Sequence, residues 1–270
     1  MNNKLQTILL KAKEDVYTHL SGGNLSRILG QGYDFSELRE YDSSDDIRHI
    51  SWINSAKLGK PYVKKMHEER ELNVALCMLL DGRFLLGEKQ ELLEYLVAVL
   101  AYSAYEANDL FSTILMVGKE MKHYEPTKNI YAIENMISEF GTVELLGTKV
   151  DYAKVSAIHL ESKHLLFVVG DFLDIVDLSL LAQKHEVVVI MVRDLLEENP
   201  KVTTDEQLVN PQTNQPINQS LSKKAIEHYR AKLLEHDERL VKHFHEHNIR
   251  HMKVYNSDEF IVKLEGLFTF

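Results

Sequence analysis

The feature that most constrains the fold of this chain is a series of four short apolar runs separated by helical segments. The runs occupy residues 72–80, 110–117, 164–170 and 186–192, and the first of them reads LNVALCMLL. Continuous runs of this length, rich in Val and Leu, are typical of strands that are covered on both faces. Residues 88–108 are apolar almost all round, as expected of a deeply buried helix.

Strands that alternate with helices indicate βαβ units and a sheet that carries helices on both faces. We therefore predict an α/β fold with a doubly wound, mostly parallel sheet. Further helices are expected at residues 128–139, 151–162 and 176–184, between the apolar runs.

A polar segment at residues 194–220 interrupts this order, and it holds three of the five prolines. We predict a loop insertion there that carries a weak hairpin. A long helix is expected at about 221–247 with Asn248 as its C-cap, followed by a last strand and helix. The chain is thus divided into an N-terminal helix with a charged extension, 1–71, and an α/β domain, 72–270.

Composition excludes several classes of protein. Residues 1–71 are formally neutral, so the net charge of −10 lies in the α/β domain, and an acidic surface does not favour contact with nucleic acid phosphates. Cys77 is the sole cysteine and lies in an apolar run, which predicts a buried, inert thiol. We see neither a signal peptide nor a run of about 18 apolar residues that could span a membrane. A cytoplasmic protein without a membrane span is expected.

The charged extension contains a dense set of ionic side chains around the only tryptophan, in GYDFSELREYDSSDDIRHISW, residues 32–52. A short helix is expected to begin near Ser43 to Asp46, with Ile47, Ile50 and Ile53 on one buried stripe. Arginine forks bind carboxylates through two hydrogen bonds, so the arginines can hold the acidic side chains in a fixed network. We favour an ion-paired structural corner anchored by the tryptophan, then a docking surface for a partner, and last a catalytic site. The residues of this hallmark corner are Arg39, Glu40, Asp45, Asp46, Arg48 and Trp52.

The same stretch carries a family resemblance. The runs G-x-DF-x-E-x-REY, DD-x-R-x-I-x-W, A-x-x-G-x-PYVK and E-E-R-E-L follow one another from Gly32 to Leu72, within a hallmark segment of about fifty residues, 32–81. This combination resembles the bacterial family called domain of unknown function fifty-eight. The resemblance implies that the extension precedes a domain similar to von Willebrand factor A. It also implies a gene context beside MoxR-type AAA+ ATPases, and many relatives carry membrane helices before the hallmark.

Two aspartates follow two of the predicted parallel strands, Asp81 after the first and Asp171 after the third. Ligands of open parallel sheets bind beyond the carboxyl ends of the strands, so these aspartates are candidates for a functional site. Two neighbouring carboxylates repel by roughly 4 kcal/mol at 4 Å with an effective dielectric constant near 20. A proton, a metal ion or a basic side chain must therefore neutralise them.

The resemblance to von Willebrand A domains implies a metal-ion-dependent adhesion site, built from a D-x-S-x-S motif, a threonine and a later aspartate. Carried over, these ligands are Asp81, Thr148 and Asp171, and they would suit Mg²⁺. This chain departs from the pattern, because Arg83 and Leu85 stand where the two serines belong. We hypothesise that Arg83 pairs with one of the aspartates and replaces the metal. The rival is a weakened Mg²⁺ site from which Arg83 points away.

Two further groups of side chains have a structural and a chemical interpretation. Asp174 could join the strand-end aspartates in phosphotransfer, but a cap for a helix that begins near Ile175 is the favoured role. His236, His243 and His247 lie on one line of the long helix, and the last two are one turn apart. Metal binding by this pair is weighed against rings that border the apolar stripe, and the second is favoured.

The leading functional hypothesis is a non-catalytic interaction module that works as an adaptor with a MoxR-type AAA+ ATPase or its client, an association implied by the resemblance alone. The partner would bind at a crevice formed by Asp81, Arg83, Thr148 and Asp171. The alternative is a metal-dependent phosphohydrolase that uses Asp81, Asp171 and Asp174. A third class, structural self-association, would be insensitive to changes in the crevice.

Overall fold

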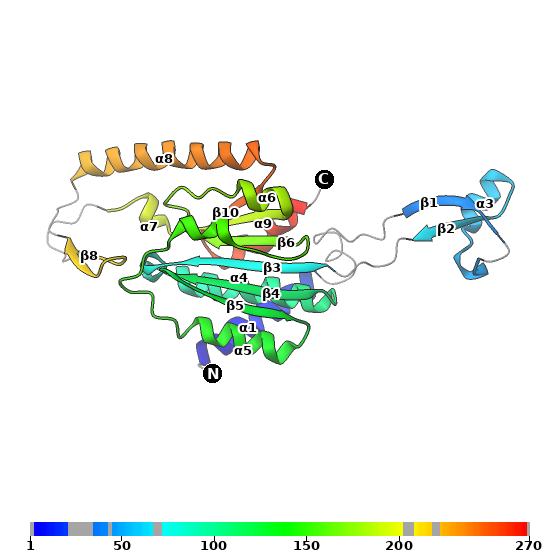
Figure 1. Ribbon diagram of the computed structural model, residues 1–270, viewed down its shortest axis with the longest axis horizontal. Coiled ribbons are helices and arrows are strands. Elements are labelled where there is room, and N and C mark those ends of the chain that lie inside the picture. Colours follow the sequence, from blue (N-terminus) through cyan, green and yellow to red (C-terminus); the bar gives the residue numbers. More distant parts are fainter. Residues whose placement is uncertain are drawn as a thin grey trace.

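A computed structural model describes residues 3–20, 35–42, 45–66, 72–201, 208–217 and 222–268. Its main sheet has the strand order β10-β7-β6-β3-β4-β5 (Figure 1). In chain order these strands are β3 (Asn73–Leu80), β4 (Leu110–Val117), β5 (Glu120–Thr127), β6 (Leu165–Gly170), β7 (Glu186–Val192) and β10 (Arg250–Val254). All neighbouring pairs are parallel except β4 and β5.

The four apolar runs form β3, β4, β6 and β7, as predicted. β3 lies between β4 and β6, so successive strands are added first on one side of β3 and then on the other. This reversal is the hallmark of a doubly wound sheet, and the carboxyl ends of β3 and β6 are the place where ligands of such sheets bind. The predicted fold class is confirmed.

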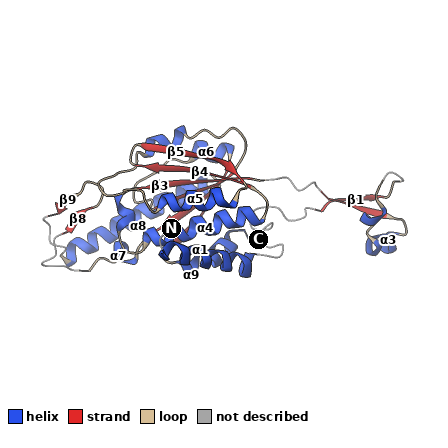
Figure 2. Ribbon diagram, turned by 90° about the horizontal axis from the view of Figure 1, so that it is seen from below, coloured by secondary structure: helices blue, strands red, loops and turns tan. Residues whose placement is uncertain are grey.

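Helices cover both faces of the sheet (Figure 2). One core joins alternate residues of β3, such as Leu76 and Met78, to α1 (Asn3–Asp15), α4 (Lys89–Glu106), α5 (Ile130–Phe140) and α9 (Ser257–Phe268). The other core joins Cys77 and Leu79 to α6 (Ser179–Lys184) and α8 (Lys223–Glu246). Adjacent strand residues point to opposite faces, so alternate residues of β3 are buried in different cores.

The N-terminal helix is present and belongs to the first of these layers. α1 buries Leu5, Leu9 and Ala12, and a π-helical turn at Val16–Leu20 continues it. Within the part of the chain that the structure describes, no helix combines the length and the apolar character needed to cross a bilayer.

The charged extension forms a small unit of its own. β1 (Phe35–Glu40) pairs antiparallel with β2 (Tyr62–Met66), and between them lie a 3-10 helix, Ile47–His49, and α3 (Trp52–Leu58). Both views draw β1, β2 and α3 away from the main sheet. The sequence predicted only a short helix here, and the two strands were missed because their charged side chains hide any alternation.

Several predicted elements differ in detail. Residues 151–162 were expected to be an α-helix, but only a 3-10 helix at Tyr152–Ala157 is present. β5 was not predicted, because its polar residues are exposed at a sheet edge. The insertion does carry a hairpin, β8 (Leu208–Asn210) with β9 (Gln215–Ile217), and a short helix, α7 (Leu195–Glu198), precedes it.

The long helix ends one residue earlier than predicted, with His247 as its C-cap and Asn248 as the residue after it. α8 stops at Glu246, and Asn248 has a left-handed backbone conformation with φ of 54°. The amide of Ile249 then donates to the carbonyl of Phe244 at 2.8 Å, which closes the last turn. Asparagine tolerates this conformation better than most residues, so its place after the helix was readable from the sequence.

Candidate functional site

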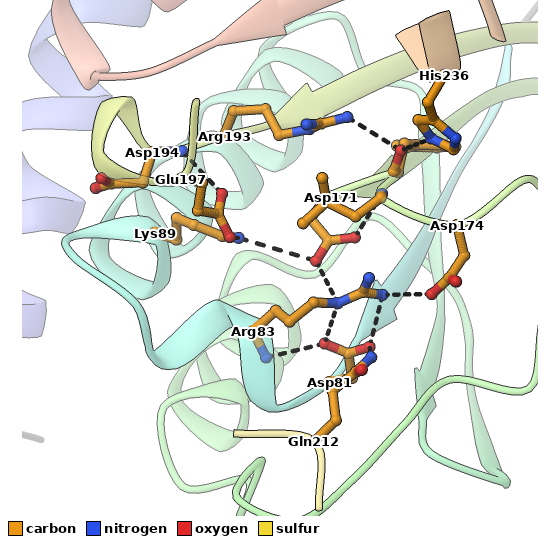
Figure 3. Close-up of polar contacts among 12 residues, drawn as sticks. Asp81, Arg83, Lys89, Asp171, Asp174, Arg193, Asp194, Glu197, Gln212 and His236 are labelled. Carbon is orange, nitrogen blue, oxygen red and sulfur yellow. Dashed lines mark hydrogen bonds and ion pairs between the residues drawn. The ribbon is translucent and has the colours of Figure 1, made fainter. Parts of the chain in front are cut away.

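The candidate site lies at the carboxyl ends of β3 and β6, where the strand order reverses. Asp81 follows β3 directly and Asp171 follows β6, and the two strands are neighbours. Both aspartates are almost fully buried. Figure 3 shows that their carboxylates face the same guanidinium group, that of Arg83.

Arg83 is held by a turn that its own neighbour caps. Asp81 is the N-cap of the 3-10 helix Gly82–Leu85, and its Oδ1 accepts from the Arg83 amide at 2.9 Å. Arg83 Nε and Nη2 donate to the two oxygens of Asp81 at 3.1 and 2.8 Å. Nε also lies 2.8 Å from Asp171 Oδ2, and Nη2 lies 3.0 Å from Asp174 Oδ2. The predicted pairing of Arg83 with the strand-end aspartates is therefore present, and it includes Asp174.

The charges of this cluster reinforce one another. Burial alone would lower the pKa of Arg83, but Asp171 and Asp81 outweigh it, so the pKa is raised and the guanidinium stays charged. Burial raises the pKa of Asp171, while Arg83 and Lys89 oppose that rise and Asp81 adds to it. Burial likewise raises the pKa of Tyr152, whose hydroxyl oxygen accepts from Arg83 Nη2 at 3.1 Å. A buried arginine with this many acceptors is a fixed structural charge.

A second buried cation, Lys89, lies on the Asp171 side of the cluster. Its ammonium group binds Glu197 Oε1 at 2.6 Å and lies 3.9 Å from Asp171 Oδ2. Glu197 is held in turn by a capping box, since its Oε2 accepts from the Asp194 amide at 3.1 Å. Sequence reasoning missed both residues. The spacing of Asp194 and Glu197 is nevertheless a readable sign of a helix N-terminus.

The residue after Asp171 has a strained backbone that α8 holds in place. Phe172 is fully buried with a positive φ of 50°, which is unfavourable for an aromatic residue. Its carbonyl accepts from Arg193 Nη2 at 3.0 Å and from His236 Nε2 at 2.9 Å. Arg193 follows β7, is fully buried, and pairs with Asp237 of α8 at 3.0 Å. The long helix is therefore attached to the loop that presents Asp171.

Thr148 lies beside the cluster without joining it. Its hydroxyl donates to the Leu145 carbonyl at 2.7 Å, and its own carbonyl accepts from the Gly82 amide at 3.2 Å. Of the three expected metal ligands, the structure thus brings together the side chains of Asp81 and Asp171 only. The Arg83 guanidinium occupies the space between them. These residues fit a divalent cation only if Arg83 moves away, and the preference for no metal stays a prediction.

Two further aspects of the crevice were not foreseen. Asp174 does not cap a helix near Ile175, because α6 begins four residues later, where Asp177 Oδ1 accepts from the Ser179 amide. The hairpin tip also reaches the site, and Gln212 Nε2 donates to Asp81 Oδ2 at 2.7 Å. Gln212 lies 131 residues from Asp81 in the chain, so no local pattern connects the two.

The hallmark corner is ion-paired but is not anchored by its tryptophan. Arg39 pairs with Asp45, and Arg48 pairs with Asp46, which caps the 3-10 helix that follows it. Glu40 pairs with Lys60 instead of an arginine. Trp52 is 68% exposed, so the expectation of an anchor was wrong.

The expected isoleucine stripe of the corner was wrong as well. Ile47 and Ile53 are exposed, and α3 has no buried residue. Ser43, expected near the start of that helix, lies outside the described residues.

The histidines of α8 have structural partners. His243 Nε2 accepts from the Leu178 amide at 3.2 Å and lies 3.7 Å from Asp177 Oδ1, and its ring is tilted by 58° against that of His247, with the centroids 4.7 Å apart. Burial lowers the pKa of His243, as does His247, while Asp177 and Glu246 oppose them. Among the described residues, no group of three or more His, Cys, Asp or Glu side chains is arranged to hold a metal ion.

Comparison with known proteins gives one family and a few distant relatives. The sequence pattern described as "Protein of unknown function DUF58" matches residues 37–239, a range that contains the whole crevice cluster. The uncharacterized proteins Mb1516 of Mycobacterium bovis and Rv1480 of Mycobacterium tuberculosis are each 24% identical over 203 residues, which is 70% of this chain. The match covers 64% of either relative, so the chain spans less than two thirds of their length.

Two solved structures also resemble the chain. They are a conserved hypothetical protein BatB from Bacteroides thetaiotaomicron and an aerotolerance-related membrane protein from Bacteroides fragilis. Each is 11% identical with a TM-score of 0.45 and covers 73% of this chain, which corresponds to 96% and 98% of their own lengths.

Proposed function

The chain belongs to the DUF58 family of proteins of unknown function, and from this premise we propose that it is a non-catalytic module that binds a protein partner at the crevice between β3 and β6. The resemblance described for the sequence suggests a MoxR-type AAA+ ATPase, or a client of one, as that partner. The module would then be an adaptor in ATP-driven remodelling or maturation of other proteins.

One observation carries this proposal: the central charge of the crevice, Arg83, is engaged with three carboxylates at once. A general acid or base must change its protonation state near neutral pH, and a guanidinium does not. The hydroxyl groups of Tyr152 and Thr148 are in hydrogen bonds, with Arg83 and with a backbone carbonyl respectively. This arrangement is suited to rigid recognition of a surface, because each group has its orientation fixed.

The site keeps the position of an adhesion site but replaces its chemistry. In the von Willebrand A pattern, a bound cation would accept a carboxylate of the partner. Here Arg83 takes the place between Asp81 and Asp171 that such a cation would need. We propose that the site is a degenerate metal-ion-dependent adhesion site, with a tethered guanidinium as the fixed cation.

The proposal is tested by binding of a MoxR-type ATPase, measured by affinity capture and biolayer interferometry. We expect Arg83→Ser to abolish binding, because the carboxylates then repel and the crevice rearranges. Arg48→Ser is the matched control, since Arg48 also follows an N-cap aspartate by two residues but is exposed. Loss of binding in Arg48→Ser alone would show that the partner docks on the hallmark corner.

The enzymatic alternative has its own test. A screen of phosphate esters with Mg²⁺ and Mn²⁺ should give no turnover above that of Asp81→Ala. Turnover by the wild-type protein that this variant loses would contradict the proposal and favour a metal-dependent phosphohydrolase that uses Asp81, Asp171 and Asp174.

A further inference from the structure

The tip of the β8–β9 hairpin covers the crevice through two polar contacts. The Pro211 carbonyl accepts from the Gly147 amide at 2.8 Å. The Gln212 amide group donates to Asp81 Oδ2 at 2.7 Å, on the carboxylate that Arg83 also binds (Figure 3). The hairpin tip thus binds the Asp81 carboxylate, although the two lie more than 100 residues apart in the chain.

Glycines in two other loops make room for this tip. A Cβ atom on Gly82 would lie 1.9 Å from the Pro211 carbonyl oxygen, a distance that no side chain can adopt against backbone. Gly147, which donates to the same carbonyl, has a φ of 77° that strongly favours glycine. The close approach of the hairpin therefore depends on Gly82 and Gly147, which lie outside it. These two glycines allow the tip to cover Asp81.

None of the hairpin residues whose exposure is described, 209–216, belongs to either core. Three of them at the tip are half-buried and the others are exposed. Val209, the large apolar side chain among these residues, is 49% exposed. Displacement of the tip would therefore expose little apolar surface and would chiefly exchange two hydrogen bonds, so it costs little compared with unfolding of any core element.

The crevice carries an excess of negative charge that points to the kind of group it would accept. Arg83 contacts Asp81, Asp171 and Asp174, while Lys89 binds Glu197 at 2.6 Å and lies 3.9 Å from Asp171, so the described ion pairs of the cluster join two cations to four carboxylates. The Asp174 side chain is 37% exposed. The partners of the Asp81 carboxylate are all N–H donors: the Arg83 amide and guanidinium and the Gln212 amide. A group that replaces Gln212 must also donate, and it gains further if it is positively charged.

We propose that the crevice accepts a basic side chain, lysine or arginine, of its protein partner, and that the hairpin tip occupies this position with Gln212 in the unbound chain. The inference rests on the proposed function, because it assigns a chemistry to the partner of the same site. The hairpin is then an internal competitor, and the partner binds only when the tip leaves.

The first test compares two glycine substitutions in the full chain, with tetralysine and tetraglutamate peptides as probes in calorimetry. Gly82→Ala forces the tip away from the site, whereas Gly266→Ala, in α9, meets open space. We expect Gly82→Ala to bind tetralysine about tenfold more tightly than the wild type, because the competing state is removed. Gly266→Ala should bind as the wild type does, and none of the proteins should bind tetraglutamate.

A second pair of variants releases the tip without a steric clash. Gln212→Glu places a carboxylate against Asp81, and Gln215→Glu makes the same change of charge at an exposed position of the same hairpin. Hydrogen exchange of the Gly147 amide, which donates to Pro211, reports whether the tip has left. We expect fast exchange and tighter tetralysine binding in Gln212→Glu only.

Three results would overturn the inference. One is equal tetralysine affinity of the wild type and of a variant in which the Gly147 amide exchanges fast. Another is retention of slow Gly147 exchange in both variants. The third is a gain in Mg²⁺ affinity without a gain for tetralysine, which would make the uncovered site a cation site. If the ATPase still binds the wild type and not Arg83→Ser, the proposed function stands while this inference fails.

Discussion

At the scale of single residues, two arginines have the same local setting and differ in burial. Arg83 and Arg48 each follow an N-cap aspartate by two residues and bind its carboxylate with Nε and Nη2. The Arg83 side chain is 14% exposed and that of Arg48 is 87% exposed. Exposed ion pairs contribute little to stability, whereas removal of one partner from a buried cluster leaves the other charges uncompensated.

This contrast gives a prediction for Arg83→Leu. We expect its free energy of unfolding to fall by about 3–5 kcal/mol near neutral pH, because buried carboxylates lose their cation. Their pKa values would then rise in the folded variant, which takes up protons, so the loss should shrink as the pH is lowered. Urea denaturation monitored by circular dichroism at several pH values measures both effects. Arg48→Leu is the control and should leave the midpoint unchanged; an equal loss in both variants would contradict the buried-cluster interpretation.

The sequence allowed part of the crevice to be found at this scale. Asp81 and Asp171 could be identified from the sequence because a polar residue that follows a buried strand lies at a known edge of a parallel sheet. Arg83 followed from the need for a counter-charge. Thr148 failed as a ligand because the position of a hydroxyl in a loop depends on the local backbone, here the Leu145 carbonyl. Gln212 could not be predicted at all, because its contact depends on the tertiary path of the insertion.

At the scale of elements, α8 is attached to the sheet by charge as well as by apolar packing. Asp237 binds Arg193 at 3.0 Å and Lys253 of β10 at 2.6 Å. We expect Asp237→Ala to lower the free energy of unfolding by about 3 kcal/mol, because fully buried Arg193 is left without its carboxylate. Glu238→Ala, the adjacent exposed residue of α8, is the control. Thermal denaturation compares the two, and equal midpoints would show that Arg193 finds another partner.

His243 gives the junction of α8 with α6 a dependence on pH. Its pKa is lowered in the folded state, so the unfolded chain binds the proton more readily. The stability it contributes is complete above the unfolded value of about 6.5 and is lost as the pH falls from there through the folded value. Protonation also removes the acceptor that Nε2 offers to the Leu178 amide.

We therefore expect His243→Gln to reduce the loss of stability between about pH 7.5 and about pH 5.5. Denaturant titrations at both pH values measure this loss. His228→Gln, at an exposed position of the same helix, should leave it unchanged. An unaltered pH dependence in His243→Gln would assign the effect to other groups.

Elements with a strong apolar pattern were predictable, whereas the charged and polar strands β1, β2 and β5 were not. β3, β4, β6 and β7 are buried strands, and their sequences show it. β5 has its side chains mostly exposed, so its strand character comes from pairing with β4 and not from its composition. β1 and β2 were missed for the same reason. The helix expected at 151–162 is shortened to a 3-10 turn, and no observed contact explains why the α-helix does not continue.

At the scale of the whole molecule, the charged extension and the α/β domain give different optical signals. Trp52, the only tryptophan, is 68% exposed on α3. We expect native fluorescence at the emission wavelength of tryptophan in water, with strong quenching by iodide. Unfolding of the main sheet, followed by circular dichroism, should change this emission little. A blue-shifted native spectrum that shifts to the red with the loss of the sheet would show that Trp52 packs against the domain.

The crevice is assembled from stretches that lie far apart along the chain, around residues 81, 171, 193, 212 and 236. A nascent chain released from the ribosome as far as α6 would have three of the carboxylates but neither the hairpin tip nor the helix that holds Phe172. The carboxylates of such an unfinished chain would be uncovered, because the competing Gln212 has not yet been synthesised. The site would therefore be closed last, when the insertion and α8 have been added and folded onto the sheet.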